Sequence, residues 1–176
     1  VYIFDIGFKK LKRFIMKTCI NSEFGKLEGV IIHTPGSEVE NMTPENAERA
    51  LYSDILNLSI ASKEYRQLAG VLKKISPVFE VKDLLTRILE NEEVKIDLLK
   101  EICLNEGIAG KEMELAKNPA SVLAKLLIEG VVLEKNNLTQ YLSNERFLMR
   151  PLHNLFFTRD AAMGMNENML IGKMAK

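Results

Sequence analysis

The chain has 176 residues, of which 47% are hydrophobic and 27% are charged, a composition typical of a globular protein with one buried core. Its 24 basic side chains balance its 24 acidic ones, so no overall charge favours binding to nucleic acid or to an anionic membrane surface. No apolar run approaches the ~20 residues of a membrane-spanning helix. We therefore expect a cytoplasmic protein that binds neither nucleic acid nor membranes, and its two distant cysteines, Cys19 and Cys103, fit a reducing compartment.

Residues 1–20 are predicted to form an N-terminal extension. Basic side chains lie among its aromatic ones instead of preceding an apolar core, which is the wrong order for a signal peptide. A short amphipathic helix at a membrane surface is one interpretation of this pattern. The simpler hypothesis is that Met16 is the natural start and that residues 1–15 are upstream or non-native sequence.

Residues 21–82 are predicted to form the first α/β unit. A β-branched run, Val-Ile-Ile, favours a buried strand over residues 27–33. The Thr-Pro-Gly that follows indicates a turn. A short, unbroken apolar strand of this kind is typical of the interior of an α/β sheet.

The unit continues with a predicted helix and a second strand. Thr43-Pro44 is typical of a helix start, and apolar residues then recur every three or four positions as far as Ile75. We expect one continuous helix, which Pro77 ends, and then a strand over residues 78–81. Strand, helix and strand in this order predict an α/β fold.

Residues 83–145 are predicted to form an inserted helical bundle. Two stretches of amphipathic sequence are punctuated by glycines and by an Asn-Pro pair. The first stretch is rich in acidic residues, which is typical of a solvated helical surface. We expect four or five short helices with no strand between them.

Residues 146–176 are predicted to start a second α/β unit. Strand-like sequence covers residues 146–152, continues through residues 154–160, and returns at residues 168–176. An edge strand without a covering helix is a poor place for a domain to end. We therefore expect this unit to be truncated.

The chemistry-bearing residues of this unit lie at the end of its second strand. Asp160 at the carboxyl end of a strand could accept two parallel hydrogen bonds from a guanidinium or amidine group, with Arg159 beside it. A surface salt bridge or a turn cap is the simpler interpretation of the pair. Asn154 shares a face with Asp160 in an unbroken strand, and it could bind a ligand carboxylate or cap a loop.

The remaining reactive side chains favour structural roles. His33 and His153 are the only histidines, and neither has a neighbour in sequence that would orient it as a general base. Cys103 follows apolar residues at helical intervals, which indicates a buried, inert thiol. The sequence contains no nucleophile motif, phosphate loop or metal-ligand spacing, so we expect no metal and no cofactor.

Two segments of the chain resemble the arginine deiminases of the guanidino-group-modifying superfamily. The first is "VIIHTPG" followed by Thr43-Pro44, which is similar to the family's strand, His-x-Pro-Gly and Thr-Pro helix start. The second is "HNLFFTRD", residues 153–160, which resembles Pro-Asn-Leu-aromatic-Phe-Thr-Arg-Asp. The helical insertion also lies where such deiminases carry a helix bundle, so the resemblance spans roughly residues 21 to 176.

The resemblance implies a partial five-bladed α/β propeller of the pentein type, with an inserted helical bundle. It also implies the hydrolysis of L-arginine to L-citrulline and ammonia through a cysteine-bound amidino intermediate. By residue-by-residue match, Asp160 is a catalytic carboxylate that binds the guanidinium group. Asn154 binds the amino-acid end of the substrate, and Arg159 lies beside the site. The family's catalytic Cys and His, and its second carboxylate, lie outside this sequence, so we expect the fragment itself to be inactive.

Three departures from the family pattern bear on the substrate. His153 and Ala161 stand where the family usually has proline, and Thr34 stands where an acidic residue is commoner. The substrate is therefore L-arginine or another guanidino compound. The alternatives are a related amidinotransferase or dimethylarginine hydrolase, or a non-catalytic truncated protein that acts as an interaction module. We also expect a homo-oligomer, because an incomplete propeller exposes apolar strand faces and edges.

Overall fold

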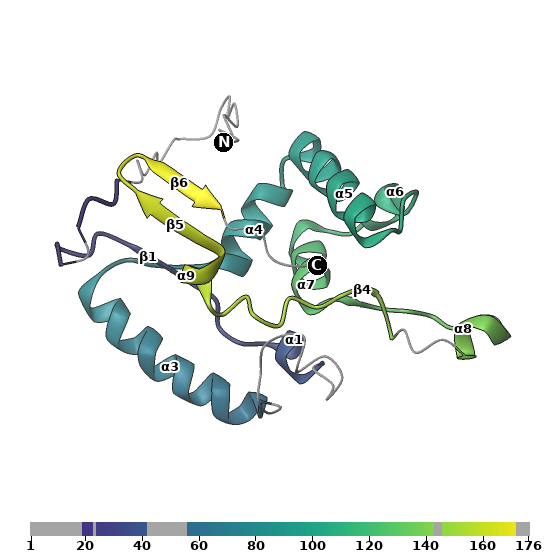
Figure 1. Cartoon of the computed structure of the whole chain (residues 1–176), viewed down its shortest axis with the longest axis horizontal. Coiled ribbons are helices and arrows are strands. Elements are labelled where there is room, and N and C mark those ends of the chain that lie inside the picture. Colours follow the sequence, from purple (N-terminus) through teal and green to yellow (C-terminus); the bar gives the residue numbers. More distant parts are fainter. Residues whose placement is uncertain (1–18, 23, 42–55, 143–145, 172–176) are drawn as a thin grey trace. The chain divides into compact units, whose positions relative to one another are not determined.

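The computed structural model describes residues 19–22, 24–41, 56–142 and 146–171 (Figure 1). The chain divides into two compact units. One unit is Leu27–Phe156, and the other joins Val1–Lys26 to Phe157–Lys176. Each unit has its own short strands, which pair in two-stranded sheets.

A strand–helix–strand arrangement opens the larger unit. Strands β1 (Val30–Ile32) and β2 (Val78–Glu80) are parallel, with Ile31 opposite Phe79. Helix α3 (Leu58–Ile75) lies between them in the sequence, as a parallel pair requires. The predicted α/β class is therefore confirmed, with strands shorter than expected. The described strands form no closed sheet, and the propeller stays a prediction.

Helix α3 begins later than the apolar spacing predicted. The side chain of Asn57 accepts hydrogen bonds from the backbone N–H groups of Ser59, at 3.0 Å, and Ile60, at 3.3 Å, and its own backbone is extended. An N-cap of this kind marks the start of a helix, so the prediction of one continuous helix is wrong at Asn57. The predicted start at Thr43-Pro44 lies outside the described residues. The predicted end is confirmed, because α3 ends at Ile75 and its C-cap Ser76 lies directly before the proline.

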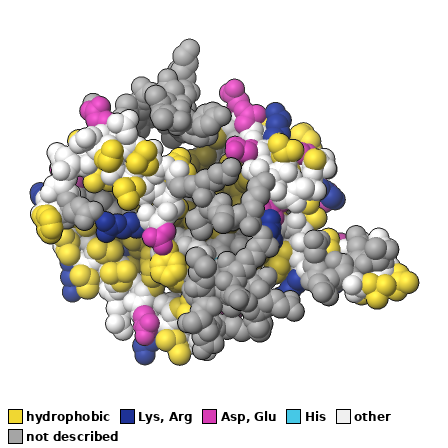
Figure 2. Space-filling model, in the orientation of Figure 1, with side chains coloured by type: hydrophobic (Ala, Val, Ile, Leu, Met, Phe, Trp, Pro, Cys, Tyr) yellow, Lys and Arg dark blue, Asp and Glu magenta, His cyan; other side chains and the backbone are white. Residues whose placement is uncertain are grey.

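One face of α3 exposes apolar side chains to solvent. Figure 2 shows hydrophobic side chains gathered at the lower left, where α3 lies in Figure 1. Their exposed fractions are half or more: Ile60 57%, Leu68 51%, Val71 56% and Ile75 61%. Part of the apolar stripe predicted for this helix is therefore exposed to solvent and not buried.

The described residues of the predicted helical segment include five helices. They are α4 (Val81–Leu89), α5 (Glu92–Glu106), α6 (Glu112–Ala116), α7 (Ala120–Glu129) and α8 (Leu138–Leu142). Their main hydrophobic core is formed by Leu89, Leu99, Cys103, Leu115, Leu123, Ala124, Leu127 and Met149. The described part of this segment is therefore mainly helical, and its role as an inserted bundle stays a prediction. Within these described residues, no helix is both long and apolar enough to cross a membrane.

A short strand interrupts the helical segment, contrary to prediction. Strand β3 (Val131–Val132) pairs antiparallel with β4 (Phe147–Met149), and Val131 lies opposite Met149. The sequence did not predict this strand, because two β-branched residues are too few to show the alternation of apolar and polar side chains that is typical of a strand. Pairing with a strand that is distant in sequence satisfies the backbone at these positions.

The smaller unit contains a helix and a β-hairpin. Helix α9 (Thr158–Ala161) leads into β5 (Ala162–Met165), which pairs antiparallel with β6 (Asn168–Ile171). The predicted strand over residues 154–160 is wrong, because residues 153–156 form turns and α9 follows. Strand β5 was not predicted. The predicted strand over residues 168–176 is confirmed as far as Ile171, and its remainder lies outside the described residues.

Candidate functional site

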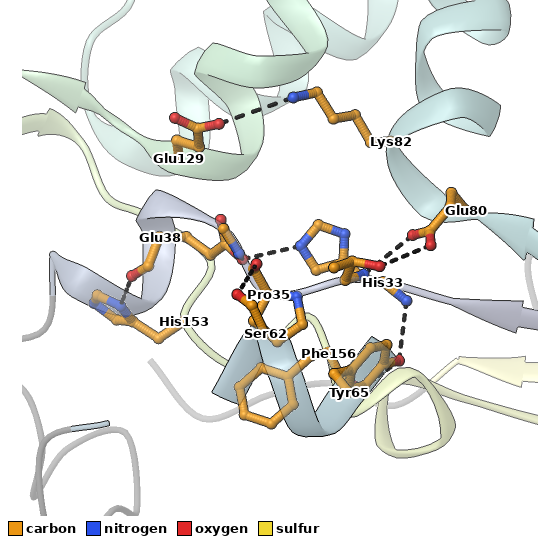
Figure 3. A network of polar contacts seen from close by, with 12 residues as sticks. His33, Pro35, Glu38, Ser62, Tyr65, Glu80, Lys82, Glu129, His153 and Phe156 are labelled. Carbon is orange, nitrogen blue, oxygen red and sulfur yellow. Dashed lines mark hydrogen bonds and ion pairs between the residues drawn. The ribbon is translucent and has the colours of Figure 1, made fainter. Parts of the chain in front are cut away.

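The carboxyl ends of the two parallel strands bring polar side chains together. Thr34 lies two residues after the end of β1, and Glu80 is the last residue of β2. The backbone N–H and the hydroxyl of Thr34 donate to the Glu80 carboxylate, at 3.1 and 2.8 Å. Carboxyl ends of parallel strands are the usual place for ligand sites in α/β proteins. This edge is therefore a candidate functional site (Figure 3).

A buried histidine–glutamate pair lies at the same edge. The His33 Nε2 atom is 3.0 Å from Glu38 Oε1, and both residues are almost fully buried. The backbone N–H of Gly36 donates to the same oxygen, at 2.6 Å. Burial by itself raises the pKa of Glu38, but the hydrogen bonds from His33 and Gly36 outweigh it and hold the pKa below its ordinary value. Glu38 is therefore a buried, stabilised carboxylate, and Nε2 is the donor.

Tyr65 connects this edge to the segment that carries Asn154. Its hydroxyl accepts the backbone N–H of His33, at 3.2 Å, and donates to the carbonyl of Phe156, at 3.5 Å. Burial raises the pKa of Tyr65 above its ordinary value, and the nearby negative charge of Glu80 raises it further. The hydrogen bond from the backbone of His33 lowers the pKa but does not cancel these effects. The phenol therefore keeps its proton at neutral pH and can donate.

His153 makes a second connection to the same segment. Its Nδ1 atom is 2.5 Å from the backbone carbonyl oxygen of Glu38 in α1 (Ser37–Glu40). Figure 3 shows His153 beside α1, with Phe156 and Tyr65 on the other side of Ser62. Both predicted structural roles for the histidines agree with these contacts, since each side chain is oriented by Glu38.

Asn154 lies half-buried in the turn formed by residues 153–156 of the larger unit. His153 and Phe156, at the two ends of this turn, make the contacts to Glu38 and Tyr65 just described. The backbone N–H of Leu155 donates to the carbonyl of Leu152, at 3.1 Å, which closes the turn. Asn154 therefore lies in a turn that makes a hydrogen bond to the rest of the unit at each of its two ends.

Arg159 and Asp160 lie in the smaller unit, on α9, and both side chains are exposed. The backbone N–H of Asp160 donates to the carbonyl of Phe157, at 3.1 Å, as in a helical turn. Since this backbone is not extended, the predicted alternation of faces along residues 154–160 is wrong. Arg159 and Asp160 are neighbours on one short helix, whereas Asn154 belongs to the other unit.

The two cysteines differ in their surroundings. Cys103 is fully buried in the core of the helical segment, and burial, with a smaller effect from the charge of Glu112, raises the pKa of its thiol. A thiol of this kind is a poor nucleophile, as predicted. Cys19 is exposed. Across the described ranges, no three His, Cys, Asp or Glu side chains are grouped closely enough to hold a metal ion.

Sequence reasoning missed three residues of this network. Glu38 follows His33 by five positions, just beyond the Pro-Gly turn, and no motif marked it. Tyr65 falls within the apolar spacing of α3, which predicts packing and not a polar contact. Glu80 was read only as a strand residue, although the carboxyl end of a parallel strand is a signal that could have found it.

Comparisons with known proteins point to one family. A family model for arginine deiminase matches residues 48–176, a range that includes Asn154, Arg159 and Asp160. The chain is similar to the arginine deiminases of Oenococcus oeni and Pediococcus pentosaceus, each 32% identical over 170 residues. It is 29% identical over 168 residues to the arginine deiminase of Staphylococcus epidermidis. These alignments cover 88% of this chain but only 41–42% of the relatives, so the chain spans well under half the length of the curated relatives it matches.

Proposed function

Because the chain belongs to the arginine deiminase family, we propose that it is the N-terminal part of an enzyme that hydrolyses L-arginine to L-citrulline and ammonia. The observation that carries this proposal is the family match over residues 48–176, which includes the Asn-Leu-Phe-Phe-Thr-Arg-Asp segment. The proposal concerns the whole protein, of which this chain supplies one part of the site.

Asp160 is proposed as the catalytic carboxylate that binds the substrate guanidinium. A guanidinium group is planar and permanently charged, and it presents pairs of parallel N–H donors that match the two oxygens of a carboxylate. The exposed position of Asp160 on α9 leaves the carboxylate accessible to a ligand or to another part of the protein. Bidentate binding would fix the guanidinium carbon for attack. Asn154 is proposed to bind the amino-acid end, and Arg159 to lie beside the site.

The proposed reaction has two stages. A cysteine thiolate attacks the guanidinium carbon and ammonia leaves, which gives an amidino group bound to sulfur. A water molecule, deprotonated by a histidine, then adds to the same carbon, citrulline leaves and the thiolate returns. Cys103 does not fit the first role, because it is buried in an apolar core and the pKa of its thiol is raised. We propose that the nucleophile and the base lie outside this chain, which is then inactive by itself.

The architecture proposed for the whole protein is a five-bladed α/β propeller. The parallel pair β1 and β2, joined through α3, supports this as one strand–helix–strand unit. In this proposal residues 21–82 form the first propeller unit, residues 83–145 the inserted bundle and residues 146–176 the start of the next unit. Residues 1–20 form an extension.

Self-association is part of the proposal. The exposed apolar side chains of α3, such as Val71 and Ile75, are the feature that supports it. Light scattering should give a mass that is a multiple of the chain mass at micromolar concentration. A monomer across the accessible concentration range would contradict this part of the proposal.

Product analysis of the full-length protein tests the proposed function. The protein is incubated with L-arginine, with dimethylarginine, and with L-arginine plus glycine as an amidino acceptor. We expect citrulline and ammonia from L-arginine in equal amounts, and no turnover by this chain alone. Dimethylamine from dimethylarginine, or ornithine formed only with glycine, would instead assign the protein to the related hydrolases or amidinotransferases.

A further inference from the structure

The turn that carries Asn154 is held at its first residue by a short hydrogen bond. His153 Nδ1 lies 2.5 Å from the carbonyl oxygen of Glu38. A carbonyl oxygen can only accept, so Nδ1 must carry the proton. This N–H is present in the neutral ring with that tautomer and also in the charged ring, so protonation of Nε2 does not remove the contact. The bond therefore holds the turn against α1 in either state of the imidazole.

The other end of the turn has a weaker contact. The Tyr65 hydroxyl donates to the Phe156 carbonyl at 3.5 Å, which is near the outer limit for a hydrogen bond. The same hydroxyl accepts the backbone N–H of His33, at 3.2 Å. Tyr65 thus links β1 to the end of the turn, but the contact at Phe156 contributes less than the one at His153.

The chain entering the turn is also fixed in place. The backbone N–H of Leu152 donates to the carbonyl of Ile128 in α7, at 3.0 Å. Gly130 lies very close to the end of β4 and the residues after it. A Cβ added to Gly130 would lie 2.9 Å from both the carbonyl oxygen of Met149 and the nitrogen of Pro151. The entry is fixed by backbone contacts, and His153 and Tyr65 are two side chains that hold the turn itself.

We propose that His153 is a positioning residue for Asn154, with Tyr65 in a supporting role. The inference rests on the proposed function, in which Asn154 binds the amino-acid end of the substrate. By holding the first residue of the turn on α1, His153 fixes the direction in which the Asn154 side chain points. His153 does not touch the substrate, and it acts only through the turn.

The consequence for kinetics follows from where Asn154 binds. The amino-acid end of the substrate is remote from the reacting carbon, and we expect its contacts to be equally strong in the ground state and in the transition state. Losing them raises KM and leaves kcat nearly unchanged. A purely structural defect would lower the active fraction, and hence the apparent kcat, without changing KM.

The test compares variants of the full-length protein in an arginine turnover assay. His153→Ala should raise KM for L-arginine by roughly 3- to 10-fold, the effect of one lost hydrogen bond, with kcat kept within about 2-fold. His153→Asn should restore most of the affinity, because the amide Nδ2 is as many bonds from Cβ as Nδ1 and also donates. Tyr65→Phe should have a smaller effect in the same direction.

Tyr141→Phe removes the hydroxyl of a tyrosine that is 68% exposed on α8, and it should leave both constants unchanged. An unchanged KM in His153→Ala, or a lower kcat at unchanged KM, would overturn the positioning role. Failure of His153→Asn to recover affinity would count equally against it.

A second measurement separates this inference from the proposed function. Amide hydrogen exchange of the 152–156 segment should be faster in His153→Ala than in the wild type, and near normal in His153→Asn. A wild-type protein that does not turn over arginine would reject the proposed function. Unchanged exchange in His153→Ala would reject the positioning role, whether or not the protein is an arginine deiminase.

Discussion

The Glu38 carboxylate shows how one residue connects the fold to the candidate site. Its side chain stabilises the turn after β1, through His33 and Gly36, and its backbone carbonyl holds His153. Because the carboxylate is buried, its charge requires these donors. Stability and the position of the Asn154 turn therefore depend on the same residue.

Replacing Glu38 by Gln should lower the free energy of unfolding at neutral pH by about 1.5–3 kcal/mol, the range for hydrogen bonds to a charged group. The folded-state pKa of Glu38 lies below its ordinary value. Its contribution is therefore fully present above the unfolded-state pKa and is lost as the pH falls through the folded-state value. Urea unfolding at a series of pH values should show the difference between wild type and variant shrinking in acid.

The control for this prediction is Glu40→Gln, an exposed glutamate on the same helix. Its unfolding curve should follow that of the wild type at every pH. A difference between wild type and Glu38→Gln that stays constant from neutral pH into acid would contradict the assignment of a stabilised charge to Glu38.

Gly130 is a second residue whose identity is set by its surroundings. Its backbone has φ 84° and ψ 167°, a region that is almost restricted to glycine, and β4 passes close to it. Gly130→Ala should therefore cost about 1–3 kcal/mol in the free energy of unfolding. Gly70→Ala, in the interior of α3 with open space around its Cβ, should instead stabilise the protein by about 0.5–1 kcal/mol. Thermal unfolding of the two variants checks both signs, and two shifts in the same direction would contradict this account.

At the scale of elements, α5 shows how the helical segment is held together. Asn91 caps its start by accepting from two backbone N–H groups, and Gly107 ends it with φ 72°. Between these ends Leu99 and Cys103 are fully buried, whereas Leu104 is 74% exposed. One face of α5 therefore contributes to the core and the other faces solvent.

This asymmetry predicts different effects for the same substitution on one helix. Leu99→Ala should lower the free energy of unfolding by about 2–5 kcal/mol, because it leaves a cavity among packed side chains. Leu104→Ala should change it by less than about 0.5 kcal/mol, because the side chain is already in water. Chemical denaturation of the two variants provides the comparison. Equal losses would contradict the observed packing of α5.

Element boundaries also show what the sequence could predict. The run Val30–Ile32 and the stop before Pro77 were predicted because both depend on local chemistry. Asn57 was not predicted as an N-cap because the apolar spacing continues on both sides of it. That spacing depends only on apolar residues and gives no information on a polar capping side chain. Strand β3 was missed because its pairing with β4 is distant in sequence.

The segment 153–160 was misread for a physical reason. Adjacent aromatic residues favour strands, but a strand needs a partner for its backbone groups. Here two of the backbone N–H groups bond locally instead: Leu155 donates to Leu152, and Asp160 donates to Phe157. Asn154, Arg159 and Asp160 were named by resemblance alone and stay a prediction, whereas the network of Glu38 and Tyr65 required the structure.

At the scale of the whole molecule, the chain carries only part of the proposed site. It spans 41–42% of its deiminase relatives, and within it Asn154 and Asp160 belong to different units. The central claim is that Asp160 binds a planar, positively charged substrate group. Its test requires the full-length protein, in which every proposed participant is present.

Steady-state kinetics of Asp160→Asn in the full-length protein test that claim most directly. Asparagine keeps the size of the side chain but removes its charge and one acceptor, so citrulline formation should fall by at least about 100-fold. Asp97→Asn, at an exposed aspartate on α5, should retain wild-type turnover. An Asp160→Asn variant that turns over L-arginine at close to the wild-type rate would contradict the account.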